Sequence, residues 1–408
     1  MTTPTPAPPR ALAPDLARGT MLLFIALANT PYHLWGGGHD TLSAHPTGGT
    51  HADQITRAAI AIAVDLRVYP MFAFLFGYGM MQFARSRAAR GFDERGVRTM
   101  LRRRHWAMIG FGFVHAALLF AGDVLGAYGL AGLVLVALFF RRRDKTVAIW
   151  AAVFALVLAG FAASMVAGGL FLAGSGDATA SADWGAAAVG GSPDYLATIP
   201  ARLAFWAFIT PGQGLVGMAV PVAILLGWLA ARHRVLEEPR RHRRLLWPTA
   251  VLGIAVAWLG ALPDGLHQVG VQVAPPEAPW MFVGVAMLTG VAGGLGYAAA
   301  IGLIAAHVGE VLGWFGRAVE AVGRRSLTFY LLQSIVLAPL MSAWGLGVGA
   351  HVNSLAAALI ATAVWCGSLP LALALARRGA RGPFEAVLRR LTYGRVTPVA
   401  GARSASPA

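Results

Sequence analysis

The sequence predicts an all-α polytopic transmembrane bundle of about ten spans, accompanied by interfacial amphipathic helices. Of its 408 residues, 57% are hydrophobic and only 12% are charged, whereas soluble domains carry about 25% charged residues. The formal net charge is +15, and the arginines cluster at the ends of apolar segments, which is the positive-inside pattern of membrane proteins. A nucleic-acid-binding face would interleave basic and aromatic residues along a helix, so we expect the lipid bilayer as a partner and no nucleic acid.

Ten apolar stretches follow one another along the chain, most of them near the roughly 20 residues that one helical pass requires. They cover residues 20–36, 66–83, 106–121, 124–140, 147–173, 212–231, 246–262, 279–307, 327–345 and 353–376. The Arg-rich connections between them must lie on one side of the membrane, and even numbers of spans permit this. These connections are residues 85–104, 141–145, 232–244 and 317–325. The sequence therefore predicts a multi-pass protein of the plasma (inner) membrane with both termini cytoplasmic.

The two ends of the chain differ in composition from the apolar middle. Residues 1–17 contain five prolines and lack the continuous apolar region and cleavage site of a signal peptide. We expect residues 1–17 and 395–408 to be disordered cytoplasmic tails. Residues 18–394 then form the transmembrane bundle, with 18–145 as the half that carries the site and 146–394 as the remaining spans.

Three shorter segments have apolar residues at helical spacing and are predicted to lie at the membrane interface. The first, 52–65, is on the outer side and contains Asp53, Arg57 and Asp65; the last two could form an interfacial ion pair. The other two are cytoplasmic, and their apolar residues are Leu312, Phe315, Val319 and Val322 in one and Phe384, Val387, Leu388 and Leu391 in the other. We expect all three to be structural.

Two arginine triplets, 102–104 and 141–143, bracket a predicted helical hairpin that contains two ionisable side chains, His115 and Asp123. An aspartate at the centre of a bilayer costs about 2.5 to 3.5 kcal/mol on insertion scales, so ionisable residues within spans are functional candidates. Arg104 and His115 lie on nearly the same helix face, about 16 Å apart along the axis. Asp123 could cap the next helix. It can pair with His115 only if the turn folds back; otherwise His51 could pair with Asp123 or Asp65.

Several local strings resemble the DUF418 (YeiB-like) membrane protein family. In the amino-terminal half these are Ala17-Arg18-Gly19 with Asn29, the run YPMFAFLFGYG at 69–79, and His115 with Gly122-Asp123-Val124-Leu125 and Tyr128. In the carboxy-terminal half they are GRRSLTFYLLQS at 323–334, RGPFE at 381–385 and RRLTYG at 389–394. The resemblance covers nearly the whole chain. Phe329 is a departure, because the family usually places an asparagine there.

The DUF418 proteins are in turn similar to a group of transmembrane acyltransferases that includes heparan-α-glucosaminide N-acetyltransferase. The shared pattern would be carried here by Arg18, Gly19, Asn29, His51, Ala52, Asp65, Tyr69, Pro70 and Phe72. The resemblance implies transfer of an acyl group from cytoplasmic acyl-CoA, acting as a co-substrate, to a lipid or glycan acceptor in the cell envelope. It implies no tightly bound cofactor.

The residues themselves are compatible with this chemistry. Acyl transfer to a hydroxyl or amine needs a base or a nucleophile, and histidine suits either role. The sequence contains no Gly-x-Ser-x-Gly elbow, no His-Glu-x-x-His zinc motif and no phosphate-binding loop, so we expect no metal. The histidines predicted on or near the outer half are His33, His39, His45, His51 and His115. We expect His115, Asp123 and His51 to be catalytic, and Arg104, Asn29, Asp65 and Arg18 to bind substrate or cofactor; arginine forks suit the phosphates of CoA.

Two other function classes remain compatible with the sequence. The protein could be a transporter or exporter of a hydrophobic or anionic solute, although broken helices in corresponding halves, which mark many transporters, are not evident in the sequence. It could also be a non-catalytic membrane scaffold. Donor, acceptor and oligomeric state are left open, and an oligomer is possible.

Overall fold

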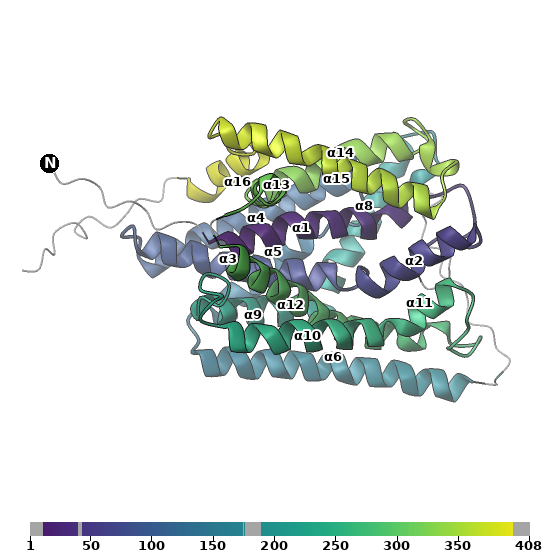
Figure 1. Ribbon diagram of the computed structural model, residues 1–408, viewed down its shortest axis with the longest axis horizontal. Coiled ribbons are helices and arrows are strands. Elements are labelled where there is room, and N and C mark those ends of the chain that lie inside the picture. Colours follow the sequence, from purple (N-terminus) through teal and green to yellow (C-terminus); the bar gives the residue numbers. More distant parts are fainter. Residues whose placement is uncertain (1–10, 40–42, 174, 176–188, 310, 395–408) are drawn as a thin grey trace, which may run out of the picture.

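The computed structural model describes residues 11–39, 43–173, 175, 189–309 and 311–394. Within these ranges the chain is a bundle of helices without a β-strand, apart from one isolated bridge between His39 and Pro46. Most long helices run along the long axis of the molecule (Figure 1). The predicted all-α transmembrane bundle is confirmed.

In the described chain, the helices that could cross a membrane are fewer than the ten predicted spans. Four helical segments in the described ranges are long and apolar enough to cross a membrane, namely His51–Ala88, Asp144–Leu172, Pro279–Val308 and Ser354–Arg377. Two bent helix pairs raise the number to six if each pair is one span. The prediction of ten spans is therefore not confirmed.

The principal helices fall close to the predicted apolar stretches. They are α1 (Leu12–Asn29), α3 (Val68–Ala88), α4 (Glu94–Leu118), α5 (Leu125–Phe139), α6 (Asp144–Leu172), α8 (Ile199–Pro211), α9 (Ala219–Arg232), α10 (Arg243–Gly260), α12 (Val283–Val308), α14 (Ser326–Met341) and α15 (Ser354–Arg377). The first and the sixth predicted spans differ most from the structure.

The first helix begins inside the segment predicted as a disordered tail. α1 starts at Leu12 and includes Pro14, which lies in its first turn. A proline is tolerated there because the first backbone N–H groups of a helix have no partner within the helix. The boundary at residue 17 was therefore wrong. Residues 1–10 and 395–408, the rest of the predicted tails, lie outside the described residues.

The sixth predicted span, 212–231, is the second part of a longer broken helix. α8 continues into a π-helical turn, η3 (Gly212–Val216), and the chain then bends by 50° before α9. Met218, just before α9, has a left-handed conformation with φ of 55°, which is strained for a residue with a side chain. A second bend, of 47°, separates α10 from the short helix α11 (Leu262–Gln268).

All three predicted amphipathic segments are helices. α2 (His51–Ala63) lies near α11 at one end of the bundle, whereas α13 (Trp314–Gly323) and α16 (Pro383–Tyr393) lie toward the other end (Figure 1). The charged residues of α2 do not face solvent, because Arg57 is 4% exposed and donates to Gln268 of α11 and Ser354 of α15. α2 is thus held by polar contacts inside the protein, and no hydrogen bond or ion pair joins Arg57 to Asp65 in the described chain.

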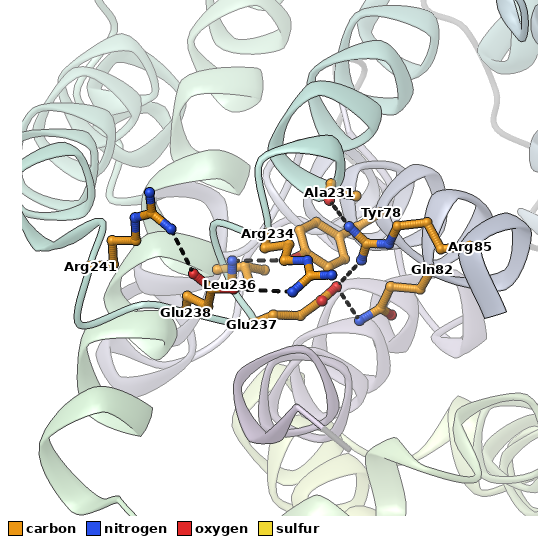
Figure 2. A network of polar contacts seen from close by, with 9 residues as sticks. All are labelled: Tyr78, Gln82, Arg85, Ala231, Arg234, Leu236, Glu237, Glu238 and Arg241. Atoms are coloured by element: carbon orange, nitrogen blue, oxygen red, sulfur yellow. Dashed lines mark hydrogen bonds and ion pairs between the residues drawn. The ribbon is translucent and has the colours of Figure 1, made fainter. Parts of the chain in front are cut away.

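The connection between α9 and α10 is tied to the Arg-rich end of α3 by polar contacts (Figure 2). Arg85 of α3 forms an ion pair with Glu237 and donates to the carbonyl of Ala231. The hydroxyl of Tyr78 accepts a hydrogen bond from the backbone N–H of Leu236 at 3.1 Å. These contacts fix the ends of α3 and α9 relative to each other, and they place the predicted Arg-rich connection at the end of the bundle opposite α2 and α11.

Candidate functional site

A cavity of about 370 Å³ lies at the end of the bundle that contains α2 and α11. Its walls come from the ends of α1 and α3, the loop at 43–45, the turn between α4 and α5, α8 with η3, α11, α12 and Tyr330 of α14. Aromatic side chains form much of this lining, including those of Tyr69, Phe72 and Tyr128. The cavity is therefore within the size range of small-molecule sites and has the largely apolar walls typical of them.

Two of the predicted site residues, Asn29 and Asp65, line this cavity. Asn29 is the last residue of α1 and precedes a 3₁₀ turn, η1 (Thr30–His33), whose Pro31 and Tyr32 continue the wall. Asp65 follows the end of α2. The structure thus brings Asn29 and Asp65 into the wall of one cavity.

Asp65 is paired with a histidine that the sequence reasoning did not select. The Nε2 atom of His45 lies 2.7 Å from Oδ2 of Asp65, and both residues line the cavity. The His45 side chain is 3% exposed and that of Asp65 is 26% exposed. His45 was one of several histidines in outer segments, and its spacing to Asp65 carries no recognisable motif, so only the folded chain distinguishes it.

The backbone around Asp65 is held in an unusual conformation. Leu66 has φ of 59°, and this turn separates α2 from α3. Its carbonyl oxygen packs against Gly290 of α12, where a Cβ atom would overlap it. Only glycine therefore admits the turn at this distance, and α12 helps to position Asp65.

Arg67 also fixes this turn, and the sequence reasoning missed it. Its side chain is fully buried and donates to the carbonyls of Ala61 at 3.2 Å and Ala257 at 2.7 Å, and to the carbonyl of Asp65. The sequence did contain a sign of its importance, since an arginine within an apolar stretch is a candidate functional residue by default. Its carbonyl partners indicate that it holds α2, α3 and α10 together around the cavity.

The second pair, His115 and Asp123, forms because the turn between α4 and α5 folds back. His115 Nδ1 lies 2.8 Å from Asp123 Oδ1, and both residues are buried. The close return of the chain requires Gly112, where a Cβ atom would overlap Asp123 Oδ2. Asp123 also accepts a hydrogen bond from the backbone N–H of Gly126 at 2.8 Å in the first turn of α5. Asp123 therefore both pairs with His115 and caps the amino-terminal end of α5.

This second pair lies behind the cavity wall. Neither His115 nor Asp123 lines the cavity, but Tyr330 does, and its hydroxyl is 3.4 Å from Asp123 Oδ1. The Tyr330 ring also lies 5.2 Å from the His115 ring, measured between centroids. His115 Nε2 is buried and has no hydrogen-bond partner among the residues the structure describes. The pair supports the wall that carries Tyr330.

His51 has no comparable contacts. It is the first residue of α2, is exposed, and does not line the cavity. The alternative pairings of His51 with Asp123 or Asp65 are not formed, since these carboxylates bind His115 and His45 instead.

Arg18 and Arg104 lie toward the Arg-rich end rather than in the cavity. Arg18 forms an ion pair with Asp15 at 3.2 Å and donates to the carbonyl of Leu75 at 3.2 Å. Arg104 is close enough for its charge to interact with those of Arg18 and Glu385, but it makes no hydrogen bond or ion pair with any described residue. Leu75 is three residues from Phe72 in the cavity wall, about 4.5 Å along α3. The layer between the arginines and the cavity is therefore thin.

The described ranges contain no group of three or more His, Cys, Asp or Glu side chains that could hold a metal ion. The His and Asp side chains that line the cavity are His45 and Asp65, which form a pair, and Asp264 and His267 of α11.

Comparison with known proteins agrees with the predicted family resemblance. Residues 230–395 match the family model described as "Protein of unknown function (DUF418)", which confirms the resemblance for the carboxy-terminal part. The chain is also 27% identical over 374 residues to "Uncharacterized protein YxaH" of Bacillus subtilis (strain 168). That alignment covers 86% of this chain and 85% of the relative. It therefore extends over most of the chain, well beyond the matched carboxy-terminal part.

Proposed function

We propose that this DUF418-like protein is an integral-membrane acyltransferase, which moves an acyl group from acyl-CoA to an acceptor bound in the cavity. The observation that carries the proposal is the His45–Asp65 pair, which lines an aromatic-walled cavity in a membrane bundle. A histidine held by a carboxylate beside a binding cavity is the arrangement that general-base catalysis needs.

The hydrogen bond assigns a role to each nitrogen of His45. Asp65 accepts the Nε2–H proton, so the Nδ1 atom of the neutral ring carries a lone pair. Nδ1 takes the proton from an acceptor hydroxyl or amine while the acceptor atom attacks the thioester carbonyl carbon. The C–S bond then breaks, and the imidazolium returns the proton to the thiolate of CoA. Asp65 stabilises the imidazolium in between, as the buried aspartate does in serine hydrolases.

The donor binds at the opposite, Arg-rich end in this proposal, which the positive-inside pattern predicts to be cytoplasmic. Arg104 and Arg18 bring two positive charges into one region, and guanidinium groups bind phosphate oxygens well. Only a thin layer around Phe72 and Leu75 separates this region from the cavity. The pantetheine arm of CoA is the part that would cross this layer and present the thioester to the acceptor.

The remaining predicted residues take secondary roles. Asn29 is in the cavity wall and would bind the acceptor, whereas His115 and Asp123 position Tyr330 from behind that wall. His51 has no role in this mechanism, because it is exposed outside the cavity.

A transporter is the second candidate, and one observation favours it. The broken helix formed by α8, η3 and α9 contributes Gln213 to the cavity, and transporters often bind solutes at helix breaks. Uptake of a solute into vesicles without acyl-CoA, unaffected by loss of His45, would favour transport over acyl transfer.

The transferase proposal is tested with purified protein reconstituted in vesicles that contain an extract of cell-envelope lipids. Release of free CoA thiol from acetyl-CoA is followed for the wild type, for His45→Ala and for His51→Ala. We expect His45→Ala to lose the activity and His51→Ala to keep it. Equal rates for all three proteins would reject the proposed base.

A further inference from the structure

We infer that the cavity opens sideways toward the lipid between α8 and α12, and that its ligand is a membrane amphiphile with an alkyl chain. The inference deepens the proposed function by assigning the acceptor to the lipid phase, and it rests on that proposal only for the statement that the ligand accepts an acyl group.

The cavity has a polar side and an apolar side. The polar side comprises the His45–Asp65 pair and Asp264, His267 and Gln268 of α11. On the side formed by α8 and α12, the residues that these two helices contribute are apolar: Phe205 and Ile209 from α8 and Val283 and Met287 from α12. Gln213 of η3 is the polar residue next to this side. A ligand that matches both sides has a polar head at His45 and an apolar chain directed between α8 and α12.

The two helices that form the apolar side do not pack along each other. α8 packs on α4 and α5, whereas α12 packs on α10, α3 and α6, and α8 and α12 make no extended contact in the part of the chain that the structure describes. The 50° bend explains this difference: α9, after the bend, packs on α12, whereas α8 and η3, before the bend, run in another direction. α8 and α12 therefore do not close the apolar wall by packing on each other, although α6 packs on the outer side of α12.

The outer face of α8 is exposed and apolar, and it adjoins the face that lines the cavity. Phe208 is 78% exposed, although it lies directly beside Ile209 of the cavity wall, and Val216 in η3 is 73% exposed. Exposed apolar residues at membrane depth contact acyl chains rather than water. The cavity lining and the lipid-facing surface are thus continuous across one turn of α8, which gives an alkyl chain a route from the bilayer to His45.

The inference is tested with a diazirine-bearing hexadecanol added to vesicles that contain the wild-type protein. After irradiation, labelled residues are mapped by mass spectrometry. We expect labels at 205–213 and 283–287, in addition to outward-facing residues such as Leu156 of α6, which is 70% exposed. Ile209→Trp fills the cavity mouth and should abolish labelling at 283–287, whereas Phe208→Trp, the adjacent outward-facing position, should leave it unchanged.

Met287→Trp fills the same cavity mouth from α12, so it tests the inference independently if Ile209→Trp does not fold. The thermal unfolding midpoint of each variant is compared with that of the wild type. The inference is overturned if residues 283–287 take up no label in the wild type, or if both tryptophan variants keep the wild-type label there. Labelling needs no acyl-CoA, so it is independent of catalysis. If the tryptophan variants block labelling but the wild type transfers no acyl group, the transferase proposal alone is rejected. If the wild type acylates a water-soluble acceptor and the tryptophan variants do not block labelling, the lipid route alone is rejected.

Discussion

At the scale of single residues, the account depends on the charge of Asp65. Asp65→Asn keeps the shape of the side chain but removes the charge that stabilises the His45 imidazolium. We expect the acyl-transfer kcat to fall about 100-fold or more, because a positioned base contributes about 10² to 10⁴ in rate. The KM for the acceptor should change little. Steady-state kinetics in vesicles measure both constants.

Asp53→Asn is the matched control, since this carboxylate lies on α2 and binds Thr50 and the backbone of Leu355 rather than a histidine. It should preserve kcat in the fraction of protein that remains folded. A loss of kcat in Asp53→Asn as large as in Asp65→Asn would mean that the fold near α2, and not the base, was tested.

Asp123 has a structural role in this account. Asp123→Ala removes the acceptor of both the His115 Nδ1 and the Gly126 N–H bonds, and both groups are buried. Leaving a buried polar group unpaired costs about 1 to 3 kcal/mol, so the free energy of unfolding should decrease by about that amount or more. Chemical or thermal unfolding in detergent measures this change. If Asp123→Ala unfolds like the wild type but transfers no acyl group, His115 and Asp123 form the catalytic pair instead.

The sequence predicted part of this site and missed the rest for identifiable reasons. Asn29 and Asp65 were predicted through the family resemblance, and both line the cavity. His45 was missed because, among the five outer histidines, only His115 and His51 were distinguished, the first by its place within a span and the second by the family resemblance. The sequence did not decide whether His115 and Asp123 form a hydrogen bond, because one straight helix through both residues would hold them apart. The structure shows that the turn folds back, with a close approach at Gly112.

At the scale of elements, the contact between α12 and the turn after α2 positions Asp65. Gly290→Ala would place a Cβ atom against the carbonyl of Leu66. Because overpacking costs about 1 to 3 kcal/mol, we expect the free energy of unfolding to decrease by that amount. Acyl transfer should also fall in the folded protein, since the turn that carries Asp65 must shift.

Gly160→Ala provides the control for Gly290→Ala. Gly160 lies on α6, and a Cβ atom there would meet nothing within 4 Å. This variant should match the wild type in activity and in its unfolding midpoint. Equal stability of both alanine variants would contradict the proposed contact between α12 and Leu66.

Element boundaries were predictable only where no helix breaks. The amphipathic helices α2, α13 and α16 were found because their apolar residues recur at helical spacing. The break between α8 and α9 was not predicted, although Pro211 and the glycines at 212, 214 and 217 interrupt the apolar run there. Whether such residues end a helix or bend it depends on what packs against them, which the local sequence does not contain.

At the scale of the whole molecule, the arginine clusters predict that the Arg-rich end is cytoplasmic and the cavity end is outside. The single cysteine, Cys366, makes this testable once it is replaced by alanine. Arg90→Cys in the α3–α4 connection should react with a membrane-impermeable maleimide only after intact cells are permeabilised. Gln272→Cys, in the exposed segment after α11, should react without permeabilisation. The reverse pattern would invert the topology and place acyl-CoA at the cavity.

Composition alone predicted the class of the protein, because an apolar chain with only 12% charged residues departs strongly from the composition of soluble domains. It was insufficient for the number of spans. α4 begins with a strongly basic segment and α14 has only 16 residues, so neither meets a simple length and hydropathy criterion. Whether such helices cross the bilayer depends on their neighbours in the bundle.

Transfer across the membrane by His45 is the central claim. The direct measurement uses vesicles in which the Arg-rich end of the protein faces outward, with radiolabelled acetyl-CoA supplied outside and the acceptor lipid extract in the bilayer. Label recovered on the acceptor is compared for the wild type and His45→Ala. The account predicts labelled acceptor with the wild type and background label with folded His45→Ala; labelled acceptor in equal amounts from both proteins would contradict it.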